Sequence, residues 1–254
     1  MEKRYKVGVA LSGGGIRGLC HAGALQAMEE LNIRPEIISG VSAGAIVGAL
    51  YADGNSPQDI LKAFKNVSFL KMTKILVPEG GFFHLNSFER YLGKLLTAKT
   101  FEDLQIPLKV VATNFDEGHS QEFSEGNLLK PVIASSSIPV LFVPKKIKNQ
   151  HFVDGGLMKN FPVSTIRDEC ELLIGINASP LTAPEYKMKI MDVALRTYHF
   201  MFRSNIVSDK ALCDILIEPD HIYDYNLFET DKADEIYQLG YTAAMHALTE
   251  KEFG

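Results

Sequence analysis

The sequence predicts an α/β fold with three layers (α/β/α), in which helices cover both faces of a mostly parallel central sheet. Short apolar runs alternate along the chain with longer segments of helical periodicity, as is typical of α/β proteins. The runs are apolar rather than alternating, which indicates strands that are buried on both faces. Glycine-rich turns join the first two runs directly to the helices that follow them.

The expected strands are the apolar runs that have turn signals on either side. They cover residues 5–10, 36–41, 107–113, 171–178 and 214–219. A further segment, residues 121–124, follows Gly118 and is expected to pair with 107–113 as a hairpin.

The expected helices are longer, and several begin or end at recognisable residues. Ser56 and Pro57 are typical of an N-cap and the first residue of a helix, and Gly54 is placed to end the helix before them. The helix after the second strand consists mostly of small residues, which allow close packing against the sheet. The expected helices cover residues 19–30, 43–51, 56–66, 87–96, 186–209 and 231–249.

Length and composition favour one globular domain. The chain has 254 residues, of which 46% are hydrophobic, and shows no repeat, low-complexity tract or linker, so we expect a single domain over residues 1–254. It contains 26 Lys and Arg against 31 Asp and Glu, a formal net charge of -5. This balance argues against nucleic acid as a partner, because binding to a phosphate backbone depends on an excess of basic residues.

Cysteine usage and hydropathy indicate a cytoplasmic protein. Cys20, Cys170 and Cys213 lack metal-ligand spacing, and an odd number of cysteines forms no complete disulfide framework. Arg17 and His21 interrupt the first apolar run, so the amino-terminal segment is expected to belong to the fold rather than to a signal peptide. No stretch reaches the roughly 18–20 uncharged apolar residues that cross a bilayer, and any membrane contact is therefore expected to be peripheral.

The segment "ALSGGGIRG", residues 10–18, joins the first strand to the first helix. Gly13, Gly15 and Gly18 fit the spacing Gly-x-Gly-x-x-Gly, the fingerprint of a dinucleotide site. The backbone N–H groups of such a loop would equally stabilise the oxyanion that forms when a carbonyl carbon is attacked. Two functions are therefore open: a nucleotide-binding module or dehydrogenase, and a hydrolase.

The second strand ends in Gly40-Val-Ser-Ala-Gly44, which matches Gly-x-Ser-x-Gly, the nucleophile elbow between a strand and a helix. Ser42 is the candidate nucleophile. A dinucleotide site would need an acidic residue near the end of this strand, but Glu36 stands at its beginning. The cofactor interpretation therefore lacks its second element, whereas the hydrolase interpretation gains one.

A serine nucleophile needs a base, and none of the seven histidines lies in a compelling local motif. The candidate base is Asp154, in Phe152-Val-Asp-Gly-Gly156, where an apolar run ends and two glycines leave room for close approach. An ordinary carboxylate is a weak base for a hydroxyl group. Burial would raise its pKa, however, and a short hydrogen bond could still activate Ser42.

Residues 69–83 mix aromatic and aliphatic side chains with Lys71 and Lys74, and Pro78 and two glycines interrupt them. Two interpretations are open. Apolar residues without clear periodicity usually pack inward, which would make the segment a partly buried connector. The same mixture of apolar and basic residues would also suit a lid or an anchor at a lipid surface.

Together these motifs resemble the patatin-like phospholipase family in order and spacing. The resemblance extends over residues 7–162. It rests on the Gly13–Gly18 loop, the Gly40–Gly44 elbow, the block Ala134-Ser-Ser-Ser-Ile-Pro139, and Asp154-Gly-Gly156 with Asn160 and Pro162 after it. It implies a serine acyl hydrolase that cleaves fatty-acyl esters and needs neither a metal nor a cofactor. The 134–139 block is structural in the family, so no catalytic role is assigned to its serines.

The resemblance also implies roles for individual residues. Ser42 would be the nucleophile and Asp154 its base, in a Ser-Asp dyad without histidine, and Gly40 and Gly44 would support the elbow. The oxyanion hole would be formed by Gly13, Gly14, Gly15 and Arg17. The expected substrate is a lipid or another acyl ester, and no oligomeric state is assigned. A lipid-binding scaffold without turnover is a further alternative.

Overall fold

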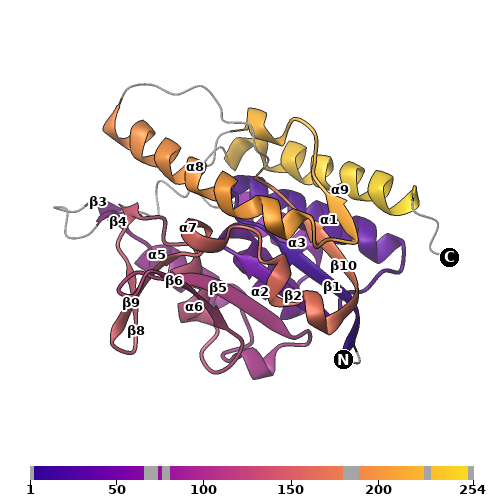
Figure 1. The fold of residues 1–254 in the computed structure, drawn as a ribbon, viewed down its shortest axis with the longest axis horizontal. Helices are drawn as coiled ribbons and strands as arrows, with labels where there is room; N and C mark the ends of the chain where they lie inside the picture. Colours follow the sequence, from indigo (N-terminus) through magenta and orange to yellow (C-terminus); the bar gives the residue numbers. More distant parts are fainter. Residues whose placement is uncertain (1–2, 66–73, 76–80, 180–188, 226–229, 251–254) are drawn as a thin grey trace.

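The structure is a computed structural model that describes residues 3–65, 74–75, 81–179, 189–225 and 230–250 (Figure 1). Within these residues the central sheet has 8 strands, in the order β11-β10-β1-β2-β5-β9-β8, with β6 also paired to β5. The strands are β1 Tyr5–Leu11, β2 Ile37–Val41, β5 Leu108–Asn114, β6 His119–Phe123, β8 Lys145–Ile147, β9 Gln150–Asp154, β10 Cys170–Ile176 and β11 Ile215–Ile217.

The sheet is mostly parallel, which confirms the predicted fold class. β11, β10, β1, β2 and β5 run parallel to one another, whereas β6, β8 and β9 are antiparallel to their neighbours. Every strand expected from the sequence is present, including the hairpin of β5 and β6. The sequence does not predict β8, because its three residues include two lysines and form no apolar run.

Helices flank this sheet. They are α1 Leu19–Glu30, α2 Ala43–Ala52, α3 Pro57–Lys65, α5 Asn86–Leu95, α6 Leu129–Ser135, α7 Gly156–Lys159, α8 Ile190–Lys210 and α9 Ala233–Thr249. Figure 1 shows α1 and α9 side by side, and α8 next to α7, in agreement with their contacts. All six helices expected from the sequence are confirmed, and the short α6 and α7 are additions.

The contact between α1 and α9 depends on one glycine in each helix. A methyl group on Gly23 would lie 1.9 Å from the carbonyl oxygen of Tyr237, and one on Gly240 would lie 2.0 Å from that of Cys20. Because interiors are close-packed, no side chain fits at either position. The carboxyl-terminal helix is thereby held directly against the helix that follows the glycine-rich loop.

Strand β6 pairs with one edge of β5, and both β2 and β9 pair with the other edge. On that edge the carboxyl-terminal ends of β2 and β9 meet. On the shared edge, β2 ends with Val41 opposite Val111, and β9 ends with Asp154 opposite Ala112. The two strand ends are therefore one step of the register apart. Ser42 directly follows Val41, so this pairing brings it next to Asp154.

The junction of these strands leaves no space for a side chain at position 155. A methyl group on Gly155 would lie 2.2 Å from the carbonyl oxygen of Val111 and 2.4 Å from Cγ2 of Val41. The first glycine after Asp154 thus permits the close approach that the sequence pattern indicates.

Residues 69–83 are described only in part. A second, small sheet consists of β3 Lys74–Ile75, β4 Gly81–His84 and β7 Val140–Phe142. The Phe83 side chain packs against the main hydrophobic core. Residues 69–73 and 76–80 lie outside the described residues, so the hypothesis of a lid or membrane anchor stays a prediction. None of the helices in the described ranges is long and apolar enough to cross a membrane.

Candidate active site

Ser42 occupies the sharp turn between β2 and α2, with a φ of 52° and a ψ of -121°. A positive φ is strained for a residue with a side chain, and such strain is concentrated at functional turns. The flanking glycines make the turn possible. A methyl group on Gly40 would lie 2.6 Å from the carbonyl oxygen of Gly44, and one on Gly44 would lie 2.3 Å from that of Leu11. The turn therefore holds Ser42 in one position at the amino terminus of α2.

The serine-rich segment at the carboxyl-terminal end of α6, residues 135–137, fixes the same turn from the other side. The backbone N–H of Ser42 donates to Ser135 Oγ at 2.8 Å, and the Ser135 hydroxyl donates to the carbonyl oxygen of Val111 at 2.6 Å. The N–H of Asp154 donates to the carbonyl oxygen of Ser137 at 2.9 Å. The segment thus joins the ends of β2 and β9, which agrees with the structural role expected for it.

Ser42 and Asp154 make the central polar contact of the site. The Ser42 hydroxyl donates to Asp154 Oδ2 at 2.6 Å, and the backbone N–H of Gly156 donates to Oδ1 of the same carboxylate at 2.8 Å. Asp154 is 1% exposed and Ser42 is 7% exposed. Both oxygens of a buried carboxylate are therefore paired, and one of them faces a serine hydroxyl.

Burial raises the pKa of Asp154 from its usual 3.8 to about 6, because the ionised form loses its contact with water. Hydrogen bonds from Ser42 and Gly156 and the nearby phenol of Tyr198 oppose this rise, since they favour the charged carboxylate. The result is a stronger base than an exposed aspartate that is nevertheless mostly ionised at neutral pH. Sequence reasoning missed Tyr198, because α8 carries no recognisable motif.

The glycine-rich loop runs from the end of β1 into η1 Gly15–Gly18, a short 3-10 helix. Gly15 has a φ of 59°, which favours glycine. The N–H of Gly13 donates to the carbonyl oxygen of Asn160 at 3.0 Å and is therefore not free for an oxyanion, contrary to expectation. In the described part of the chain, the N–H groups of Gly14 and Gly15 donate no hydrogen bond.

Asn160 packs its side chain between this loop and the turn after Asp154. A methyl group on Gly13 would lie 2.3 Å from Asn160 Oδ1, and one on Gly156 would lie 2.7 Å from the same atom. Asn160 is fully buried, and neither polar atom of its amide has a hydrogen-bond partner among the described residues. Asn160 therefore acts as a spacer that requires glycine at both positions.

Arg17 is buried, and the described contacts direct its guanidinium to a segment before α9. Its Nε donates to the carbonyl oxygen of Tyr225 at 2.7 Å, and Nη2 donates to that of Tyr223 at 3.3 Å. These contacts fasten residues 223–225 to the loop. A contribution of Arg17 to an oxyanion hole stays a prediction.

A cleft opens beside Ser42. Gly15, Ser42 and Ala43 line it together, so the glycine-rich loop and the first residue of α2 face the same space. The other lining side chains are mostly apolar, and they are Ile16, Ile46, Phe64, Ile138 and Phe142, with Ser136 and Thr230. Such a lining suits an aliphatic chain placed next to the serine.

No histidine forms a hydrogen bond with Ser42 or Asp154 in the part of the chain that the structure describes. His21 is fully buried, its Nε2 lies 2.8 Å from the carbonyl oxygen of Ser12, and burial lowers its pKa to about 4. The half-exposed His151 lies beside Asp116, with Nδ1 3.2 Å from Oδ1. Their contacts give both histidines structural roles.

The described residues show neither the acidic side chain of a dinucleotide site nor a group of metal ligands. Glu36 accepts a hydrogen bond from the N–H of Lys6 at 2.7 Å, at the sheet edge opposite the glycine-rich loop, and the carboxyl end of β2 carries no acidic residue for a ribose. Among the described residues, no three His, Cys, Asp or Glu side chains are grouped so that they could hold a metal ion.

The family model for Patatin-like phospholipase matches residues 9–166. The chain belongs to this family. The match includes the glycine-rich loop, the elbow and Asp154, so it confirms the resemblance drawn from those motifs.

Two curated relatives illustrate the similarity. Lysophospholipase NTE1 of Saccharomyces cerevisiae is 28% identical over 190 residues, which cover 71% of this chain and 11% of the relative. Patatin-like phospholipase domain-containing protein 6 of Homo sapiens is 26% identical over 277 aligned positions, covering 92% of this chain and 20% of the relative. The chain thus spans a fifth or less of the length of these relatives.

Solved structures share the fold. VipD from Legionella pneumophila superposes with a TM-score of 0.57 and 18% identity, covering 97% of this chain and 67% of that one. Human GIVD cytosolic phospholipase A2 superposes with a TM-score of 0.56 and 11% identity, covering 96% of this chain and 58% of that one. At these identities the likeness concerns the fold alone.

The raised pKa of Asp154 predicts a pH-dependent gain of stability in Asp154→Asn. A carboxyl whose pKa is higher in the folded state favours folding below its unfolded pKa, and this contribution is lost as the pH rises through about 6. The neutral amide avoids the loss. The free energy of unfolding, measured with urea, should therefore exceed that of the wild type by about 3 kcal/mol at neutral to alkaline pH and by much less near pH 4.

Asp116→Asn is the control for this measurement. Asp116 is an exposed carboxylate whose pKa is lowered, chiefly by the backbone N–H of His151, so its substitution should change stability with the opposite sign. A difference between Asp154→Asn and the wild type that stays constant with pH would contradict the destabilising burial of this carboxylate.

Proposed function

We propose that the chain hydrolyses acyl esters of lipids, with Ser42 as nucleophile and Asp154 as general base. The observation that carries the proposal is the 2.6 Å hydrogen bond from Ser42 Oγ to Asp154 Oδ2, located at an apolar cleft. A hydroxyl that donates to a carboxylate can transfer its proton along that bond as it attacks. Membership of the patatin-like phospholipase family supports this chemistry.

In the acylation step, Asp154 Oδ2 takes the proton of Ser42 while Oγ bonds to the ester carbonyl carbon. The carbonyl oxygen becomes an oxyanion, for which the unpaired N–H groups of Gly14 and Gly15 are the proposed donors. The N–H of Ala43 is a third candidate, because it starts α2 beside the cleft. The tetrahedral intermediate then collapses, and the leaving alcohol takes the proton from Asp154.

Deacylation repeats these transfers with water. Asp154 takes a proton from a water molecule as its oxygen attacks the acyl carbonyl carbon, and the same N–H groups stabilise the second oxyanion. Collapse releases the fatty acid, and Ser42 Oγ recovers the proton from Asp154.

The cleft supports an aliphatic acyl group as the part of the substrate next to Ser42. Five of its side chains are branched aliphatic or aromatic, and they come from η1, α2, α3 and the region around β7. Lipids with such chains reside in membranes or micelles, so peripheral contact with a lipid surface is part of the proposal. A silent scaffold would bind the same lipids without turnover.

Ser42→Ala and Asp154→Asn should each abolish ester hydrolysis in a folded protein. The first removes the nucleophile, and the second keeps the shape of the base but removes its proton acceptor, so losses of about 10³-fold or more are expected. The measurement is kcat/KM for a soluble short-chain ester, with circular dichroism to verify folding.

The matched control is His151→Gln, which alters the histidine nearest in sequence to Asp154 and should leave kcat/KM within about threefold. Substitution is needed to distinguish an aspartate base from a histidine base, because a carboxyl group with a pKa of about 6 titrates close to an imidazole. The pH dependence of activity would look similar for both. The dyad would be wrong if a single histidine change eliminated activity while Asp154→Asn retained it.

Ile46→Trp should select against long acyl chains. Ile46 lines the cleft one helical turn after Ser42 and is 4% exposed, so the larger indole would fill space that an acyl chain needs. Hydrolysis of long-chain esters should fall by about tenfold or more relative to short-chain esters, whereas Ile46→Val should leave the ratio nearly unchanged. An equal loss for all chain lengths would show that the cleft does not hold the acyl chain.

A further inference from the structure

Tyr198 of α8 places a buried phenol beside the carboxylate of Asp154. Its side chain is 6% exposed, and the phenol lies near enough to the carboxylate to lower the pKa of Asp154, against the larger opposite effect of burial. Within the described residues, however, this hydroxyl has no hydrogen-bond partner at ordinary geometry. An unpaired buried hydroxyl is unfavourable, so its position next to the proposed base calls for a functional explanation.

The face of α8 that carries Tyr198 packs on the turn after Asp154. The Tyr198 and Phe202 rings meet edge to face, with centroids 4.3 Å apart. A methyl group on Gly156 would lie 2.5 Å from the Phe202 ring. One turn further, the Asn205 amide donates to the carbonyl oxygen of Gly156 at 3.1 Å. Tyr198, Phe202 and Asn205 therefore lie at helical spacing over the same turn.

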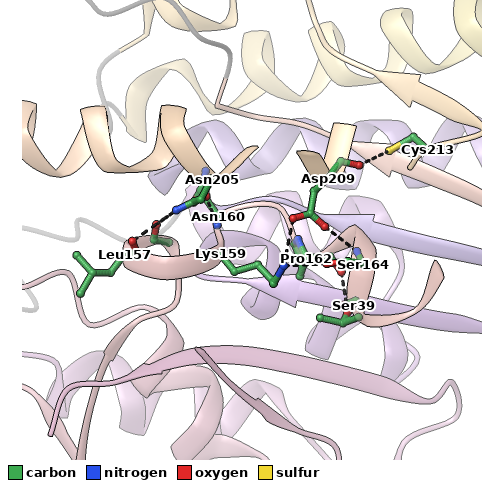
Figure 2. A network of polar contacts seen from close by, with 11 residues as sticks. Ser39, Leu157, Lys159, Asn160, Pro162, Ser164, Asn205, Asp209 and Cys213 are labelled. Carbon is green, nitrogen blue, oxygen red and sulfur yellow. Dashed lines mark hydrogen bonds and ion pairs between the residues drawn. The ribbon is translucent and has the colours of Figure 1, made fainter. Parts of the chain in front are cut away.

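The carboxyl-terminal end of α8 is held by a second set of contacts, which Asp209 makes. The Asp209 carboxylate accepts hydrogen bonds from the N–H of Ser164 at 2.7 Å and from Lys159 Nζ at 3.2 Å, as Figure 2 shows. Figure 2 also shows Asn205 beside Asn160, whose backbone N–H donates to Asn205 Oδ1 at 2.9 Å. With two attachment points on one helix, the position of Tyr198 is set by the fold.

We propose that Tyr198 is a positioning residue for the dyad: its hydroxyl donates to the Asp154 carboxylate and keeps it ionised and oriented toward Ser42. The inference rests on the proposed function, because it assigns a partner to the proposed base. Hydrogen bonds between catalytic groups are often long before substrate binds and shorten in the complex. The absence of a hydrogen bond at ordinary geometry from the Tyr198 hydroxyl, within the described residues, fits this description.

Tyrosine suits this task because it remains a donor at every working pH. Burial and then the nearby Asp154 charge raise the pKa of Tyr198 well above its usual value, so the phenol does not ionise. A neutral donor stabilises the carboxylate without adding a charge to the apolar cleft.

Within the described residues, the ionisable side chains on the elements around Asp154 are engaged with other partners. They are Lys109 of β5 with Glu169, His151 of β9 with Asp116, Lys159 of α7 with Asp209, Arg17 with the carbonyl groups of residues 223 and 225, His21 with Ser12, and on α8 Arg196 over the Phe200 ring and His199 near that of Phe202. Removal of the Tyr198 hydroxyl should therefore act on Asp154 without an intermediary.

The test is the pH dependence of kcat/KM for a soluble short-chain ester in Tyr198→Phe, measured between about pH 4.5 and pH 9. Without the donor, the ionised carboxylate is less stable, so the acid limb of the profile should move to higher pH by about half a unit or more. The loss of rate should be several-fold on the limb and smallest on the plateau. Phe keeps the ring and its contact with Phe202, and Tyr198→Leu should move the limb in the same direction.

Tyr237→Phe is the matched control. Tyr237 of α9 is also buried, with a hydroxyl that has no partner at ordinary geometry among the described residues, but it contacts neither Asp154 nor the cleft. Its removal should leave the acid limb in place. A merely structural loss would lower the unfolding midpoint in both variants without moving either limb.

The outcomes separate the two proposals. If Ser42→Ala and Asp154→Asn are inactive but the limb of Tyr198→Phe coincides with that of the wild type, the inference about Tyr198 is overturned and the dyad stands. An equal shift in Tyr237→Phe would overturn it as well. If Ser42→Ala and Asp154→Asn keep their activity, the proposed function itself fails.

Discussion

The hydrogen bond between Ser42 and Asp154 depends on two strands that end against each other on one edge of β5. Its residues lie 112 positions apart in the sequence, and they meet because β2 and β9 approach along the same edge from opposite directions. Backbone pairing rather than a loop therefore sets the distance between Oγ and Oδ2. Gly155 is essential to this arrangement, since any side chain there would push the two strand ends apart.

Burial of the carboxylate links stability to the proposed chemistry. Loss of water raises the pKa of Asp154 toward neutrality, which makes it a better proton acceptor, and the same loss makes the ionised group a destabilising element of the fold. The Gly156 N–H and the Ser42 hydroxyl limit this effect by hydrogen bonding, and the proposed bond from Tyr198 would add to it. An aspartate in such surroundings can act near the pH at which an imidazole would, so a histidine is not required.

Local sequence pattern was sufficient for the fold class and for the turns that carry chemistry. Apolar runs and helical periodicity predict the parallel strands and the long helices, and glycines around Ser42 predict the elbow, because each signal lies within a few residues. The contact of Asp154 with Ser42 is different, since it depends on the antiparallel register of β9 on β5. No local pattern encodes that register. The pattern around Asp154 made it only a candidate base, and the resemblance to a family assigned it to Ser42.

The details that the sequence pattern could not provide all depend on distant segments. The Gly13 N–H donates to the carbonyl oxygen of Asn160, and the Arg17 guanidinium donates to carbonyl oxygens of residues 223 and 225. The sequence of the loop alone therefore predicts more donors for an oxyanion than the structure leaves available. Tyr198 reaches the site only because α8 packs across the turn after Asp154. Tertiary packing, rather than motif, determines which donors stay available.

The most direct test of the account is to identify the residue that a fluorophosphonate modifies covalently, by mass spectrometry of the intact protein and its peptides. The account predicts a single adduct on Ser42, formed rapidly in the wild type and in His151→Gln but very slowly in Asp154→Asn. An adduct on another residue, or equally fast labelling of Ser42 in Asp154→Asn, would contradict the assignment of a serine nucleophile activated by this aspartate.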